Sequence, residues 1–224
     1  MSMLSRTLRL ISTLIAYLAF GLVGASFALI LPFALRRLPE GLAGQRRARR
    51  IVARIWTGYL TAMRWGGIYR VTWHGRERLG HPGQLILVNH PSLMDVLFMI
   101  SAVPEGNCVV KASLLTNPSM RPAIRACGYI PNDASLELIE KTAAVLAEGQ
   151  TLLFPEGTRT GYDGIIRLNR GAVSIGLRGA SVITPVVIRM TPPGLKRGDP
   201  WYKIPPHPYH YDIRVGDDID PEDY

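Results

Sequence analysis

Residues 85–95 read LILVNHPSLMD, and this stretch joins the end of a predicted strand to the start of a predicted helix. The apolar run 85–88 has the length of a short buried strand. Pro91 prevents a helix from extending back into that strand, and Ser92 with Asp95 has the spacing of a capping box, which begins helices. A buried strand, a polar turn and a helix in direct succession are typical of an α/β domain.

The same alternation continues on both sides of this stretch. Pro185 lies inside one apolar run and predicts a strand near an edge of the sheet, because proline cannot donate to a neighbouring strand. We predict an α/β domain over residues 67–224. Its expected strands are 70–73, 85–88, 109–111, 151–154, 182–189 and 211–215, and its expected helices are 92–101, 119–127, 135–148 and 171–177.

His90 follows the end of the strand 85–88, where a side chain can project into a crevice. Asp95 has two compatible interpretations. In the first turn of a helix its carboxylate is a cap, and if the turn folds back toward His90 the same carboxylate orients the imidazole and stabilises the imidazolium. We therefore predict that His90 is a general base and that Asp95 orients it.

A second polar turn, FPEGTRT at 154–160, also follows an apolar run. Gly157 permits a tight turn with exposed backbone N–H groups, which could stabilise an oxyanion or hold a phosphate. Thr158 adds a hydroxyl, and Arg159 can bind a phosphate with two hydrogen bonds. The alternative is an ordinary surface turn with an ion pair between Glu156 and Arg159. Two polar turns at strand ends favour a single shared site.

Residues 10–35 carry no charge. Cut at Pro32, this run would form a helix of about 33 Å, close to the roughly 30 Å of a hydrocarbon core. A signal peptide is the alternative, since Arg6 and Arg9 precede the run, but its apolar region is normally only about 7–15 residues long. A buried soluble helix is possible but would be unusually apolar on all sides. We predict a membrane helix over 10–35.

Residues 46–50 read RRARR, and apolar residues including Trp56 and Tyr59 repeat after them with helical spacing. This pattern predicts a basic amphipathic helix over 46–66 that lies in the membrane interface. A solvated charged face and a nucleic-acid patch are the alternatives, and the second lacks any reader motif. Residues 1–66 would then form a membrane anchor.

Charge is unevenly distributed along the chain. Residues 1–80 contain 13 arginines and two glutamates, a net charge of +11, whereas residues 81–224 contain 13 basic and 15 acidic residues, a net charge of −2. The basic part is therefore the N-terminal third, which indicates contact with anionic lipid and argues against a nucleic-acid-binding body. The arginines that follow residue 35 place the body in the cytoplasm by the positive-inside rule.

Other catalytic and metal motifs are missing from the sequence. It contains no GxSxG, HExxH, Walker A or GxGxxG pattern. Cys108 and Cys127 cannot form a disulfide framework. His207 and His210 follow a proline-rich stretch, so we interpret them as surface histidines. We expect no metal site.

Together the two polar turns resemble the motifs of the lysophospholipid (glycerolphosphate) acyltransferase family, and bacterial members that acylate 1-acylglycerol-3-phosphate are similar in kind. The family's N-H-x-x-x-x-D matches Asn89, His90 and Asp95, and its F-P-E-G-T-R-S matches residues 154–159, with Thr160 in place of Ser. The resemblance covers about residues 70–216. It implies a mixed sheet flanked by helices, catalysis by His90 and Asp95, and substrate binding by Asn89, Lys111, Glu156, Gly157, Thr158 and Arg159.

The sequence departs from the family in its second motif, which reads like G-x-I-F-I-D-R. Gly128, Ile130 and Asp133 can be aligned with it, but Ala134 stands where the family has an arginine thought to contact the acceptor phosphate. We expect 1-acylglycerol-3-phosphate as the acceptor, with another lysolipid, including acceptors of the ornithine-lipid type, as the alternative.

The sequence thus predicts a membrane-associated O-acyltransferase of the bacterial inner membrane, with its catalytic domain facing the cytoplasm. It would move a fatty acyl group from acyl-CoA or acyl carrier protein to a lysolipid hydroxyl, forming phosphatidic acid from 1-acylglycerol-3-phosphate. The resemblance implies no cofactor, no metal, and membrane lipids rather than nucleic acid as partners. The rival is a non-catalytic membrane-surface protein, against which the intact His90 and Asp95 argue.

Overall fold

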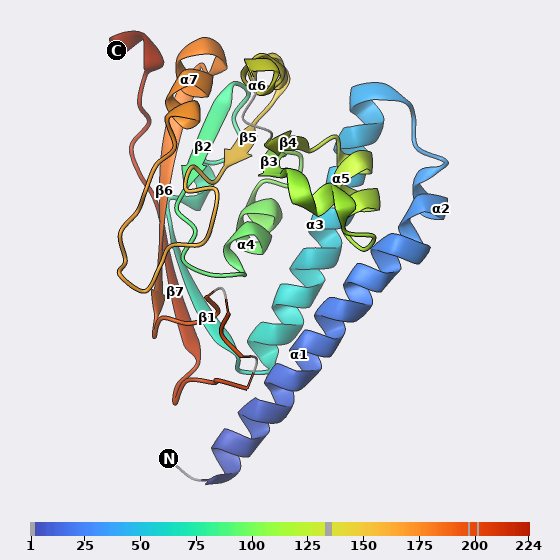
Figure 1. Ribbon diagram of the computed structural model, residues 1–224, viewed down its shortest axis with the longest axis vertical. Helices are drawn as coiled ribbons and strands as arrows, with labels where there is room; N and C mark the ends of the chain where they lie inside the picture. Colours follow the sequence, from blue (N-terminus) through green and yellow to red (C-terminus); the bar gives the residue numbers. More distant parts are fainter. Residues whose placement is uncertain (1–2, 133–135, 197, 201) are drawn as a thin grey trace.

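The strand that precedes His90, β2, lies in the middle of a seven-stranded sheet with the order β1-β7-β6-β2-β5-β3-β4 (Figure 1). The computed structural model describes residues 3–132, 136–196, 198–200 and 202–224. All neighbouring strands are parallel except β6 and β7. The expected mixed sheet is therefore confirmed. The strands are β1 (Tyr69–His74), β2 (Gln84–Val88), β3 (Asn107–Lys111), β4 (Ile130–Asn132), β5 (Thr151–Leu153), β6 (Val182–Thr191) and β7 (Tyr209–Val215).

Helices cover both faces of the sheet (Figure 1). One hydrophobic cluster joins the strands to α6 and α7, and a larger one joins them to α4, α5, α3 and α1. Because Leu85 belongs to the first cluster and Ile86 to the second, β2 is buried on both faces, as expected for a central parallel strand. The helices are α1 (Met3–Leu29), α2 (Leu31–Leu35), α3 (Gly41–Trp65), α4 (Asp95–Ala102), α5 (Arg121–Cys127), α6 (Leu136–Glu148) and α7 (Arg170–Gly179), with short 3₁₀ turns at Arg76–Arg78, Ala112–Thr116 and Pro221–Asp223.

The expectation that Pro185 marks an edge strand is wrong, because β6 lies between β2 and β7. The pairing of β6 with β7 begins one residue later, at Val186 opposite Val215. The carbonyl of Pro185 accepts a hydrogen bond from Gly216, which has already left β7. The proline therefore lies where the neighbouring strand ends, and its missing N–H interrupts no pairing.

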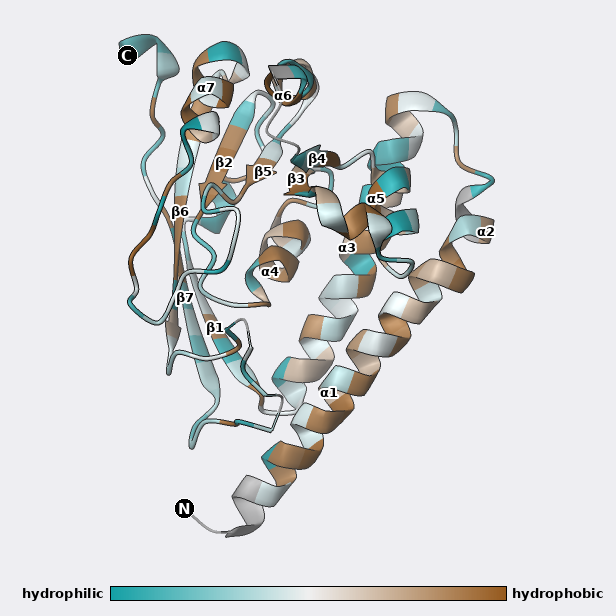
Figure 2. Ribbon diagram, in the orientation of Figure 1, coloured by the Kyte–Doolittle hydropathy of each residue, from teal (hydrophilic) through white to brown (hydrophobic). Residues whose placement is uncertain are grey.

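The apolar run predicted as one helix over 10–35 is divided between α1 and α2. Helix α1 ends at Leu29, and Pro32 lies in the first turn of α2, where a proline is tolerated because its N–H would be unpaired. Among the described residues one helix, over Thr7–Leu29, is long and apolar enough to cross a membrane, and only 17% of its most apolar window is buried. Figure 2 shows this helix as predominantly hydrophobic.

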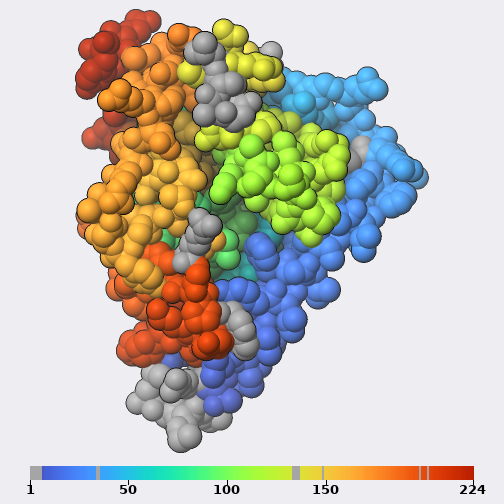
Figure 3. Space-filling model, viewed as in Figure 1, coloured from blue at the N-terminus to red at the C-terminus, as the bar shows by residue number. Residues whose placement is uncertain are grey.

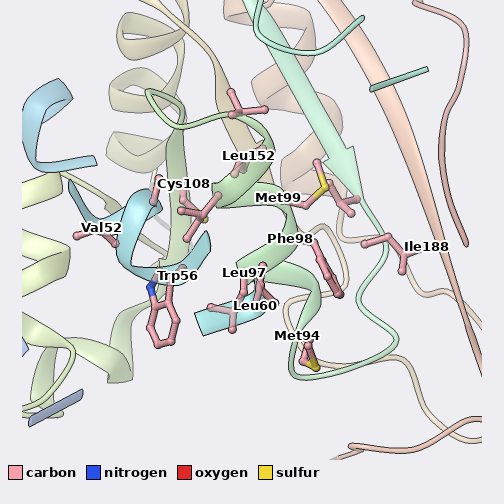
Figure 4. Packing of buried hydrophobic residues seen from close by; sticks show 14 of the residues in the cluster. Val52, Trp56, Leu60, Met94, Leu97, Phe98, Met99, Cys108, Leu152 and Ile188 are labelled. Atoms are coloured by element: carbon pink, nitrogen blue, oxygen red, sulfur yellow. The ribbon is translucent and has the colours of Figure 1, made fainter. Parts of the chain in front are cut away.

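The amphipathic helix predicted over 46–66 is present as α3, but the interpretation of its apolar face is wrong. That face is buried inside the protein, where Val52, Trp56 and Leu60 pack against α4 (Figure 4). Phe27 of α1 contacts Trp56 from the other side, with ring centroids 5.6 Å apart. A face that covers the catalytic body cannot also enter a bilayer. The boundary predicted between residues 66 and 67 stays a prediction, since one core contains residues from both sides of it.

The arginines of RRARR do not all lie on the exposed side of α3. Arg49 is only 3% exposed, and its guanidinium donates to the carbonyls of Cys127 and Glu105 at 2.7 and 3.1 Å. Arg47 and Arg50 are exposed. Arg49 therefore joins α3 to the body, and only its neighbours are available to an anionic surface.

Candidate active site

His90 and Asp95 meet where the sequence predicted. His90 lies two residues beyond β2, and Asp95 is the first residue of α4. The turn between them folds the carboxylate back, so that His90 Nδ1 and Asp95 Oδ2 are 2.9 Å apart. The side chain of Asp95 is completely buried, whereas that of His90 is 17% exposed. This geometry leaves the Nε2 side of the imidazole for a partner outside the pair.

The helix begins later than the capping-box spacing suggested, at Asp95 instead of Ser92. The reciprocal bond of such a box is nevertheless formed, because the Ser92 N–H donates to Asp95 Oδ2 at 2.6 Å. The Ser92 hydroxyl donates to the other carboxylate oxygen, also at 2.6 Å, and accepts from the Met94 N–H. Asp95 therefore closes the turn and holds the imidazole at the same time.

Glu156 belongs to the support of His90. Its Oε1 accepts from the His90 N–H and from the Thr160 hydroxyl, both at 2.8 Å. The Thr160 N–H donates in turn to the His90 carbonyl at 2.7 Å. The two polar turns predicted to share a site are thus hydrogen-bonded to each other, and the residue expected to bind substrate contacts the backbone of His90.

Asn89 also has a structural partner. Its side-chain amide bonds both backbone groups of Ile188 in β6, with Nδ2 to O at 3.0 Å and N to Oδ1 at 2.7 Å. These bonds imitate one more residue pair of the sheet after β2 has ended. Asn89 thereby fixes the backbone from which His90 projects, and substrate contact by Asn89 stays a prediction.

The expected free N–H of Gly157 is engaged. Gly157 has the positive φ of 65° that favours glycine, but its N–H closes the turn onto the Phe154 carbonyl at 3.0 Å. Thr158 is exposed, and Arg159 donates one bond to the Leu195 carbonyl at 3.0 Å. The turn thus presents side chains instead of the glycine N–H that we expected.

Two lysines lie near the edge of the sheet at which β2 ends, at different distances from His90. Lys111 is exposed at the end of β3, two strands from β2, which is about 10 Å at usual strand spacing. Lys196 donates to the carbonyls of Thr160 and Gly161 at 2.6 and 3.3 Å. The sequence analysis missed Lys196, because it lies in an irregular proline-rich loop that carries no periodic pattern.

Apolar groups form the remaining surroundings of the pair. The His90 imidazole lies 4.9 Å from the Phe154 ring, between centroids. A small apolar cavity of about 40 Å³ opens beside the turn, between Leu93 and Met94 on one side and α1, α3 and the loop before β7 on the other. A polar hydrogen-bonded pair beside an apolar cavity suits a substrate that is partly lipid.

The sequence that contains these residues matches the model of a known protein family. The family model described as Acyltransferase matches residues 70–189, which is more than half of the chain and includes both polar turns. The chain belongs to the acyltransferase family.

Relatives of this acyltransferase carry related names. It is 29% identical over 136 residues to a Caenorhabditis elegans protein named "Putative 1-acyl-sn-glycerol-3-phosphate acyltransferase acl-2", covering 55% of this chain and 47% of that protein. It is 25% identical over 152 residues to a 1-acyl-sn-glycerol-3-phosphate acyltransferase of Chlamydomonas reinhardtii, covering 64% and 45%. The chain therefore spans less than half the length of these curated relatives.

The acyltransferase fold is also found in a solved structure. The crystal structure of the 1-acyl-sn-glycerophosphate (LPA) acyltransferase PlsC from Thermotoga maritima superposes with a TM-score of 0.73 and 19% identity, covering 96% of this chain and 88% of that one. At this identity the likeness establishes the fold, including the helices that flank the sheet.

The two cysteines and His210 of the acyltransferase are not part of the site around His90 and Asp95. Burial raises the pKa of Cys108 and of Cys127 to about 12, so both thiols stay protonated near neutral pH and are poor nucleophiles. His210 bonds the Thr72 hydroxyl, and no group of three metal-ligating side chains occurs among the residues that the structure describes. The departure in the second motif, at Asp133 and Ala134, falls outside the described residues.

Proposed function

We propose that this acyltransferase moves a fatty acyl group from a thioester, acyl-CoA or acyl carrier protein, to the free hydroxyl of 1-acylglycerol-3-phosphate, forming phosphatidic acid. The observation that carries the proposal is the His90–Asp95 pair at the carboxyl edge of β2, hydrogen-bonded to the turn that holds Arg159. The names of the relatives support the choice of acceptor.

The protonation of the pair defines the reaction steps. An ionised Asp95 can only accept, so His90 Nδ1 carries a proton and Nε2 of the neutral ring is the acceptor. Nε2 removes the hydroxyl proton while the oxygen attacks the thioester carbonyl, and a tetrahedral intermediate forms. Its collapse breaks the carbon–sulfur bond, and the imidazolium returns the proton to the leaving thiolate. The products are an ester and a free thiol, and no acyl-enzyme is formed.

Cationic side chains near the pair are proposed to bind the phosphate groups of the two substrates. Arg159 has further N–H groups beyond the one that bonds Leu195, and a guanidinium binds phosphate well. Lys111 lies farther along the same edge, where it can contact a second phosphate, as on a nucleotide-bearing donor. Acceptor phosphate at Arg159 would compensate for the arginine missing from the second motif.

We also propose that α1 holds the enzyme on one leaflet of the bacterial inner membrane, with the body in the cytoplasm. The helix packs along the body: Phe20 and Phe27 contact Trp56, and the Tyr59 hydroxyl bonds the Ala16 carbonyl. Packing of the helix along the body supports entry into one leaflet beside the site.

An acyl-transfer assay tests the function. The purified full chain is incubated with palmitoyl-CoA or palmitoyl acyl carrier protein and a panel of lysolipids, including lysophosphatidic acid, lysophosphatidylcholine and lyso-ornithine lipid, and the ester products are measured. We expect phosphatidic acid from lysophosphatidic acid, and a strongly reduced yield with His90→Ala. Release of thiol without any ester would identify a hydrolase, and no consumption of donor would favour the non-catalytic membrane-surface protein.

A further inference from the structure

The carboxylate of Asp95 ends a chain of buried hydrogen bonds that begins in the last strand. The Tyr211 hydroxyl, from β7, lies 3.1 Å from the Ser92 hydroxyl, which lies 2.6 Å from Asp95 Oδ1. Ser92, Asp95 and Tyr211 are all completely buried. Neither Ser92 nor Tyr211 reaches the imidazole itself, so any effect on His90 passes through the carboxylate.

The direction of the protons in this chain follows from counting donors. The Ser92 hydroxyl has one hydrogen, and an ionised carboxylate can only accept, so that hydrogen is given to Asp95. The hydrogen between Ser92 and Tyr211 must then come from the tyrosine. The Tyr211 ring is held between Phe98 of α4 and Tyr69 of β1, at centroid distances of 4.8 and 6.0 Å. The donor is thus fixed by the core on both sides.

Such a chain matters because a carboxylate without solvent is costly to keep ionised. Burial favours the neutral acid, whereas hydrogen bonds to the anion favour the charged form. Asp95 accepts bonds from the Ser92 N–H, the Ser92 hydroxyl and His90. Burial and the nearby Asp95 raise the pKa of Tyr211 well above its usual value, so the tyrosine remains a proton donor.

We propose that Ser92 and Tyr211 are positioning residues of the acyl-transfer reaction, which act in series to keep Asp95 ionised and directed at His90. The inference rests on the proposed function for its effect on turnover. No other described side chain bonds either Asp95 oxygen, and Glu156 approaches His90 only at its backbone N–H.

Single substitutions should lower kcat and leave KM unchanged, because neither residue touches substrate. Ser92→Ala removes a hydrogen bond to a charged group, so we expect a roughly 10- to 100-fold loss of kcat. Tyr211→Phe removes a bond between neutral groups one step farther away, so we expect a loss of about 3- to 10-fold. In both variants the acidic limb of the pH–rate profile should move to higher pH, because fewer donors stabilise the deprotonated pair.

The double variant tests whether the residues act in series. If Tyr211 acts only through Ser92, Tyr211→Phe adds nothing in the Ser92→Ala background, and the double variant equals Ser92→Ala. Tyr69→Phe is the matched control, since it removes another buried phenol hydroxyl, bonded to the Leu60 carbonyl, from the same aromatic group. Thermal unfolding of every variant shows that the comparison is made on folded protein.

A second measurement separates this proposal from the proposed function. In full-length protein labelled with [15N]histidine, His90→Gln identifies the His90 signal among the five histidines. Ser92→Ala should move the pH range of that signal upward, and Tyr69→Phe should not. The positioning role is refuted if Ser92→Ala leaves kcat within twofold and the signal unchanged, or if it raises KM alone. Absence of acyl transfer by the unmodified enzyme would instead refute the proposed function. The NMR signal of His90 would still test the chain of hydrogen bonds from Tyr211 to Asp95.

Discussion

At the residue scale, the side chain and the backbone of His90 are held at three points, and Nε2 is left for the substrate. Asp95 holds Nδ1, Glu156 holds the backbone N–H, and Thr160 holds the carbonyl. The first contact comes from the start of α4, and the other two come from the turn 154–160. A base fixed in this way loses little orientation on binding substrate, which is the condition for efficient proton transfer.

Substitutions at His90 and Asp95 should show whether catalysis needs the charge of Asp95 or only its hydrogen bonds. We expect His90→Ala to lower acyl transfer by about 10²- to 10⁴-fold, the usual loss of a general base. Asp95→Asn can still accept from the Ser92 N–H and His90 with its oxygen, but its charge is gone, so we expect kcat to fall and KM to stay constant. Steady-state kinetics with both substrates measures this. Near-normal turnover of Asp95→Asn would show that Asp95 only closes the turn.

Glu156 offers a test of support against substrate binding. An amide oxygen can accept both bonds that Glu156 Oε1 accepts, so we expect Glu156→Gln to retain most of its activity and Glu156→Ala to lose kcat at least tenfold. The comparison is made by kcat and KM for the lysolipid. If Gln and Ala were equally impaired with a raised KM, the negative charge would contact substrate.

At the element scale, α3 shows what an amphipathic pattern can and cannot predict. The spacing of Val52, Trp56 and Leu60 located the helix and its apolar face correctly. It could not identify the partner of that face, because lipid and a protein core are equally apolar. Arg49 lies on the buried side, where its long side chain reaches two carbonyls that only the folded chain places there.

This position of Arg49 has a measurable consequence. We expect Arg49→Gln to lower the free energy of unfolding by about 1–3 kcal/mol, because the carbonyls of Cys127 and Glu105 lose their donor in a buried place. Arg47→Gln on the exposed side should change it by less than about 0.5 kcal/mol. Urea denaturation of the two variants measures the difference, and equal stability would contradict the buried role.

Other elements also show which features local sequence signals can predict and which they cannot. The strand β2 and the turns after β2 and β5 were predictable because apolar runs and turn residues are local signals. The three-residue strand β4 was missed, since Ile130–Asn132 is too short to show a period and includes Pro131. The bond between Ser92 and Tyr211 joins residues 119 positions apart, and only the place of β7 in the sheet brings them together.

At the scale of the whole molecule, α1 lies along one margin of the body (Figure 3), and its exposed side carries large apolar residues. Leu18 and Leu22 are 60% and 71% exposed there. Contiguous apolar surface of this kind is typical of a membrane contact. We expect exposed arginines of the N-terminal third, such as Arg47, to add attraction to anionic headgroups.

Charge placed on this margin should release the protein from membranes. We expect Leu18→Arg together with Leu22→Arg to abolish co-sedimentation with vesicles that contain phosphatidylglycerol, and to leave thermal unfolding unchanged. The matched control is Leu177→Arg on α7, where the leucine is 52% exposed and α7 packs with α6. Release by the control to the same extent would place the membrane contact elsewhere.

The position of β7 between β1 and β6 also determines when β1 can join the sheet during synthesis of the chain. Strand β1 pairs with β7 and with no other strand of the described sheet, although the ribosome makes β7 long after β1. At a synthesis rate of about 5–20 residues per second, β1 waits roughly 7–30 s for its neighbour. During that interval its backbone is open to pairing with other nascent chains. Slow translation of residues 75–208 should therefore increase aggregation more than slow translation of residues 1–66.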